Sequence, residues 1–154
     1  MIADAVEFDF KLVGTGWARA RLAVGSKSVE LTASYLGDAL GDLLAAMSLL
    51  VAGEPEARFS WDEEPGEYRW IVSCADDVAR TRVLAFEHLR GHTSDDEGRE
   101  LFNGSCSLRA LIAAVARAAH DVLDEWGIEG YRLRWVEHDF PAHELDQLDR
   151  YLAR

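Results

Sequence analysis

The chain has 154 residues, of which 49 % are hydrophobic and 29 % are charged, a composition typical of one folded domain. Its 28 acidic and 16 basic residues give a formal net charge of −12, which repels nucleic-acid phosphates and anionic lipids. No apolar run approaches the roughly 18 residues of a membrane span, and the N-terminus lacks the pattern of a signal peptide. We therefore expect a single cytoplasmic domain over residues 1–154 that binds neither nucleic acid nor membrane.

Period-two alternation of apolar and polar residues predicts three strands in the first part of the chain. Glycine-containing turns separate these strands, which we place at residues 6–13, 17–24 and 29–33. A helix is expected next, because large apolar residues recur every three or four positions from Leu36 to Leu50. Ser34 is the expected N-cap of this helix, and Gly53 followed by Pro55 is expected to end it.

Three more strands are expected in the middle of the chain, at residues 58–62, 67–74 and 80–88. Pro65 and Gly66 lie between the first two of them, in the order that a type II turn favours. Residues 89–104 are polar and irregular, so we expect a long loop there that is either functional or mobile.

The second helix is predicted by an apolar stripe that runs from Leu108 to Trp126. Either Ser105 or Ser107 is expected to cap its N-terminus. Gly127 is expected to end it, because glycine readily adopts the left-handed conformation found after helices.

The order of these elements predicts the fold class. Residues 131–136 fit either a strand or a short helix, and Pro141 opens a short C-terminal helix. Antiparallel hairpins joined to helices in this order are typical of an α+β fold. We expect a two-layer sandwich, in which a mainly antiparallel sheet of about five or six strands carries two long helices on one face.

The sequence contains none of the common motifs of active sites and cofactor sites. The turn at residues 14–16 precedes a strand, whereas a phosphate-binding loop needs a helix directly after it. Residues 143–144 begin like a zinc-protease helix, but Gln147 stands where the second histidine is required. Cys74 and Cys106 lie far apart without a CxxC pattern, so we expect free thiols. These observations predict a protein that is not an enzyme and needs no cofactor.

The candidate partner-binding site is a hairpin rich in acidic and aromatic residues. It lies within residues 54–104, which hold 13 acidic and 6 basic residues. Its members are Trp61, Asp62, Glu63, Glu64, Glu67, Tyr68 and Trp70. Tryptophan and tyrosine are common at binding hot spots, and an acidic rim suits a basic partner. The alternative is that Trp61 and Trp70 are cross-strand residues of the core.

A second group of residues supports an alternative function. His88, His92, Asp95 and Asp96 lie in or beside the long loop, and imidazoles with carboxylates can bind a divalent cation. These residues would then form the site of a small metal-dependent hydrolase or ligand-binding domain. Because a strand end and a loop do not hold the two histidines on one helical face, their spacing alone does not define a metal site.

Three segments resemble uncharacterised proteins of GC-rich actinobacteria. They are residues 17–22 (WARARL), 35–44 (YLGDALGDLL) and 59–70 (FSWDEEPGEYRW). The resemblance covers most of the chain and implies no known activity or site.

The leading hypothesis is a non-enzymatic interaction protein, in its sharpest form a small acidic immunity or antitoxin protein that blocks a basic toxin. It rests on small size, strong acidity, the acidic and aromatic hairpin and the missing catalytic motifs. The metal-dependent domain is the first alternative. A structural homo-oligomer that buries the exposed sheet face between copies is the second.

Overall fold

The computed structural model describes residues 5–88, 94–136 and 138–154, which form seven strands, three α-helices and one short 3-10 helix. The strands are β1 (Val6–Leu12), β2 (Trp17–Val24), β3 (Lys27–Ser34), β4 (Glu56–Asp62), β5 (Glu67–Ala75), β6 (Val78–Phe86) and β7 (Arg99–Ser107). The helices are α1 (Ala39–Val51), η1 (Asp95–Glu97), α2 (Leu108–Arg134) and α3 (Ala142–Leu152). No helix within the described ranges has the length and hydropathy needed to cross a bilayer.

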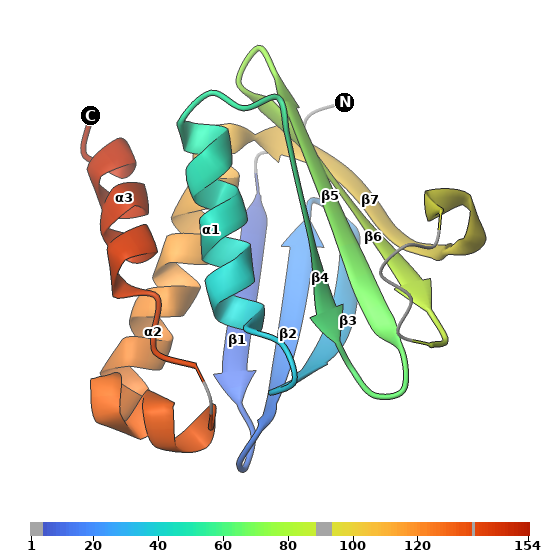
Figure 1. Ribbon diagram of the computed structural model, residues 1–154. Helices are drawn as coiled ribbons and strands as arrows, with labels where there is room; N and C mark the ends of the chain where they lie inside the picture. The colour runs from blue at the N-terminus through green and yellow to red at the C-terminus, as the bar shows by residue number, and fades with distance from the viewer. Residues whose placement is uncertain (1–4, 89–93, 137) are drawn as a thin grey trace.

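The predicted α+β fold is confirmed, but the strands divide between two antiparallel sheets. The first sheet has the order β1-β2-β3 and the second has the order β4-β5-β6-β7. Helix α1 follows β3, and the strand after it opens the second sheet instead of extending the first. In Figure 1 the three helices lie on one side of the first sheet, where α2 packs along β1, α1 along β4 and α3 against both helices.

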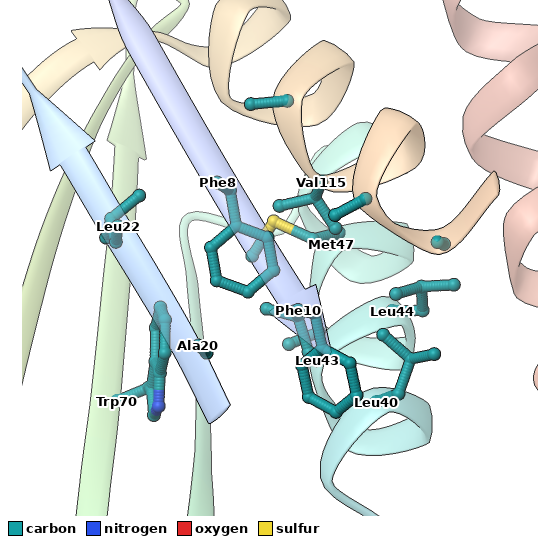
Figure 2. Packing of buried hydrophobic residues seen from close by; sticks show 14 of the residues in the cluster. Phe8, Phe10, Ala20, Leu22, Leu40, Leu43, Leu44, Met47, Trp70 and Val115 are labelled. Atoms are coloured by element: carbon teal, nitrogen blue, oxygen red, sulfur yellow. The ribbon is translucent and has the colours of Figure 1, made fainter. Parts of the chain in front are cut away.

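One cluster of buried apolar residues joins both sheets to the helices. Alternate residues of β1 point into it, so Phe8 and Phe10 are buried while their neighbours are exposed. In Figure 2 the Phe8 ring lies beside Met47 of α1, and the Phe10 ring lies farther along β1, toward Leu40 of the same helix. The Phe10 ring lies edge-to-face on Trp61 of β4 at 5.8 Å between ring centroids. Such aromatic contacts add to the burial energy that holds the two sheets together.

Helix α1 starts later than predicted, because its N-cap is Asp38 and not Ser34. The Asp38 carboxylate accepts a hydrogen bond from the backbone N–H of Gly41 at 3.2 Å, whereas Ser34 is buried at the end of β3. Glycine fits at position 41 because a Cβ atom there would lie only 2.0 Å from the Asp38 carboxylate. The loop and the cap together place Asp38 and Asp42 at one end of the molecule.

Strand β7 occupies residues that the sequence predicts to be part of a loop. Phe102 and Cys106 are buried and alternate with partly exposed residues. Gly104 is buried between them on the same face but supplies no side chain, and a Cβ atom there would lie only 3.0 Å from the Phe102 ring. Pairing with β6 therefore determines a strand whose own sequence signal is weak.

Helix α2 continues past the glycine that was predicted to end it. Gly127 breaks the helix with φ 70° and ψ 176°, as expected, and helical structure resumes up to Arg134. Tyr131 and Trp135 are fully buried, four positions apart on one face. Their packing against Phe140 and Phe10 decides that this ambiguous segment is helical.

The N-cap of α2 can be tested directly because the two candidate serines differ. The Ser107 hydroxyl accepts a hydrogen bond from the Ala110 N–H at 3.1 Å, whereas Ser105 lies within β7. We expect Ser107→Ala to lower the free energy of unfolding by about 1 kcal/mol, because an orphan N–H loses its acceptor. Ser105→Ala is the matched control in urea unfolding, and an equal loss in both variants would contradict this assignment.

Candidate functional site

The hairpin between β4 and β5 does not present its two tryptophans to a partner. Trp61 and Trp70 are only 1 % and 2 % exposed, and their ring centroids lie 5.0 Å apart in the core. The Trp61 indole N–H also donates a hydrogen bond to the carbonyl of Ala39 at 2.9 Å. This corrects the expectation that both rings form a contact surface, since the inward face of each strand carries them.

The acidic turn of the same hairpin lies at the surface and is held by hydroxyl groups. Glu63 Oε2 accepts hydrogen bonds from Tyr68 Oη at 3.0 Å and from Thr32 Oγ1 of β3 at 3.1 Å. Partial burial, and then the bond to Glu63, raise the pKa of Tyr68. Glu64 is exposed at the turn, whereas Glu67 is buried at the start of β5.

The structure brings Asp62 of this hairpin to the first turn of α1. The Asp62 carboxylate oxygen Oδ2 lies 3.3 Å from the position that a Cβ atom of Gly37 would occupy, directly before Asp38. We call Asp38, Asp42 and Asp62 the acidic cluster. Sequence reasoning identified Asp62 as a site residue and missed the other two. The spacing of Asp38 and Asp42, one helical turn apart, was the available signal.

Restricted hydration, with like charges adding to it, raises the pKa of every carboxyl in the acidic cluster. The pKa of Asp42 is raised to about 6, first by partial loss of hydration and then by the charges of Asp38 and Asp62. Solvent screens part of this effect because Asp42 remains exposed. Burial also raises the pKa of Asp62, with Glu67 and Glu64 adding to it, and burial raises that of Asp38.

The acidic cluster has no strong cationic partner within the part of the chain that is described. None of the ion pairs there includes Asp38, Asp42 or Asp62. The positive charge of His138, when it is protonated, opposes the pKa rise of Asp38 and Asp42. The cluster is therefore a site where negative charge is brought together and only weakly compensated.

The residues of the alternative metal site are placed differently. Asp95 accepts hydrogen bonds from Arg58 Nη2 at 2.7 and 2.6 Å and from Arg69 Nη1 at 2.8 Å. These bonds lower the pKa of Asp95 and engage both of its oxygens. His92 lies outside the described residues, and within them no three His, Cys, Asp or Glu side chains are grouped so as to hold a metal ion. Asp95 therefore links η1 to β4 and β5 through these ion pairs, on the face of the second sheet that points away from the main core.

His88 lines a surface hollow of about 690 Å³ between the hairpin and β7. Its wall also carries Glu63, Glu87, Glu97 and Arg99. Carboxylates, an imidazole and a guanidinium therefore share one open depression.

The two cysteines are free, as expected. Cys106 is buried in β7, where desolvation raises its pKa to about 11. Because the thiolate is the reactive form, this thiol is poorly suited to nucleophilic chemistry at neutral pH.

Substitution of Asp42 by asparagine should stabilise the protein in a pH-dependent way. The pKa of Asp42 in the folded state lies above its ordinary value of 3.8, so the stability that protonation confers is lost as the pH rises through about 6. Asparagine is neutral throughout, so we expect Asp42→Asn to melt at a higher temperature than the wild type near pH 7.5. The difference should shrink toward pH 4.5.

Thermal unfolding followed by circular dichroism at both pH values measures this difference. Glu54→Gln removes one negative charge beyond the other end of α1 and serves as the matched control. A stabilisation by Asp42→Asn that is the same at both pH values would contradict the electrostatic explanation.

Comparisons with known proteins show only a shared fold. No protein-family model and no curated protein matches the sequence. One chain of the solved CdiA-CT/CdiI toxin and immunity complex from Enterobacter cloacae is similar, with a TM-score of 0.51 at 10 % identity. The match covers 75 % of this chain and 99 % of that chain. The resemblance to actinobacterial proteins therefore stays a prediction.

Proposed function

We propose that this chain is a non-enzymatic interaction protein of the immunity or antitoxin type, which binds and neutralises a basic protein. The observation that carries the proposal is the acidic cluster. Asp38, Asp42 and Asp62 converge from α1 and the β4–β5 hairpin, and no ion pair of the described residues includes them.

A cluster of this kind opposes folding and favours binding for the same physical reason. Carboxylates held close together repel one another, and this repulsion adds to the partial dehydration that chiefly raises the pKa of Asp42. Lysine or arginine side chains of a partner would remove that repulsion and regain Coulomb energy in a partly dehydrated contact. A surface of one charge sign also speeds the encounter with an oppositely charged protein.

The fold comparison supports the same class of function. The similar chain comes from a complex between a toxin and its immunity protein. At 10 % identity no residue of that complex can be carried over, so the acidic cluster remains the basis of the binding site. The resemblance to uncharacterised actinobacterial proteins adds the expectation that such a host would supply the partner.

Affinity purification from the native host, with the tagged full-length chain as bait, tests this function. We expect a protein with more basic than acidic residues that elutes as the salt concentration rises. Its expression alone should inhibit growth of a test strain, and co-expression of this chain should restore growth. Recovery of no basic protein, or of a basic protein whose toxicity the chain leaves unchanged, would contradict the proposal.

A further inference from the structure

Segments that carry exposed apolar residues meet at the end of the molecule that carries the acidic cluster. Seven large hydrophobic residues are exposed in the described part of the chain. Five of them come from the β1–β2 turn and the first residue of β2, from the β3–α1 loop, and from the last turn of α2 and the residues that follow it. We call them the apolar end patch: Val13, Trp17, Leu36, Leu133 and Val136.

Hydrogen bonds hold the three segments together beside these residues. The Gly16 N–H donates to the carbonyl of Arg134 at 2.8 Å, and the Tyr35 N–H donates to the carbonyl of Gly16 at 2.9 Å. The Trp135 indole donates to the carbonyl of Gly37 at 3.2 Å. The Gly14 carbonyl also accepts a hydrogen bond from the Arg134 side chain at 3.2 Å. Each residue of the apolar end patch directly precedes or follows, in the sequence, one of these hydrogen-bonded residues.

The apolar end patch borders the acidic cluster. Gly37, which the Trp135 indole binds, directly precedes Asp38 and lies against the Asp62 carboxylate. Figure 1 shows the β1–β2 turn, the start of α1, the last turns of α2 and the β4–β5 turn at the same end of the molecule. The segments that carry the exposed apolar residues and the acidic cluster are therefore adjacent at one end of the molecule.

Val136 adds an observation about the backbone of this patch. Its φ is 51°, a region that β-branched residues rarely adopt, and its side chain is exposed. The chain thus keeps an apolar side chain at the surface in an unfavourable backbone conformation, where glycine or asparagine would fit with less strain.

We propose that the apolar end patch is the surface on which the basic partner docks. This inference rests on the proposed function and adds the location of the interface. The partner would bury its own apolar residues against Trp17, Leu36 and Leu133, while its lysine and arginine side chains meet the acidic cluster. An apolar centre with charges beside it is the usual anatomy of a protein–protein interface. A second copy of this chain is a poor occupant of the patch, because the acidic clusters of the two copies would repel each other.

Site-specific photo-crosslinking in the native host tests the location. A benzophenone amino acid replaces Leu36, Leu133 or Leu49 in the full-length chain, and mass spectrometry identifies the crosslinked protein. Leu49 lies on α1 outside the patch and is 50 % exposed, close to the 48 % of Leu36, so it is the matched control. We expect positions 36 and 133 to capture the same basic protein and position 49 to capture none of it.

A second pair of variants separates apolar contact from charge. Leu133→Asp should reduce the crosslink from position 36 at least about tenfold, as expected for loss of an apolar contact residue. Leu49→Asp makes the same charge change and should leave that crosslink unchanged.

The possible failures are distinguishable. Capture of a basic protein from position 49 but not from positions 36 and 133 would refute the location and leave the proposed function intact. Crosslinks between copies of this chain from positions 36 and 133 would show a homo-oligomer and refute the inference. Capture of no basic protein, by crosslinking from any position or by affinity purification, would refute both.

Discussion

Replacement of Trp61 by alanine is expected to lower the free energy of unfolding by about 3–5 kcal/mol, the range found for aromatic residues truncated in a core. Trp61 is 1 % exposed and its ring touches those of Phe10, Phe59 and Trp70. Alanine would leave a cavity where the two sheets and α1 meet. It would also leave the carbonyl of Ala39 without its indole donor.

Urea unfolding followed by circular dichroism measures the loss, with two variants for comparison. Trp61→Phe keeps an aromatic ring but lacks the N–H, so it should lose less than Trp61→Ala. Trp17→Ala removes a tryptophan that is 39 % exposed and should cost about 1 kcal/mol or less. If Trp61→Ala kept the wild-type stability and lost partner binding instead, Trp61 would be a contact residue after all.

Charge reversal in the acidic cluster is expected to have the largest effect on binding. Asp42→Lys combined with Asp62→Lys should weaken the complex with the basic partner about 100-fold, or ~3 kcal/mol, because attraction is replaced by repulsion. Folding should persist, since both side chains are at least partly exposed and the variants remove carboxylates from a place where partial dehydration, and then like charges, raise the pKa of Asp42.

The matched control changes the net charge equally at other places. Glu30 lies on the solvent face of the first sheet, and Glu54 follows α1 at the end of β4 opposite the β4–β5 turn. Glu30→Lys combined with Glu54→Lys should weaken binding much less, as measured by isothermal titration calorimetry. Equal losses in both double variants would mean that only the net charge of the chain matters.

The sequence predicted the elements whose signals are local. Apolar residues at helical spacing located α1, α2 and α3, and period-two alternation located six of the seven strands. Strand β7 was missed because Gly104 supplies no apolar side chain to its buried face, which weakens the period-two signal. The division into two sheets depends on how the strands pack. Both follow from long-range pairing, which no local pattern contains.

The candidate site was predicted only in part, for a related reason. Alternation shows that Trp61 and Asp62 point to opposite faces of β4, but it does not show which face the core covers. The N-cap was assigned to Ser34 instead of Asp38, so the start of α1 was placed incorrectly. Asp38 and Asp62 are far apart in sequence, and only the packing of α1 on β4 brings them together.

The charge-steered recognition of a basic protein is tested most directly by the association rate constant at increasing ionic strength, for the wild type and for the Asp42→Lys and Asp62→Lys double variant. The wild-type rate constant should fall steeply as salt screens the attraction, and that of the double variant should start lower and change little. Rate constants that are equal and independent of salt for both proteins would contradict recognition through the acidic cluster.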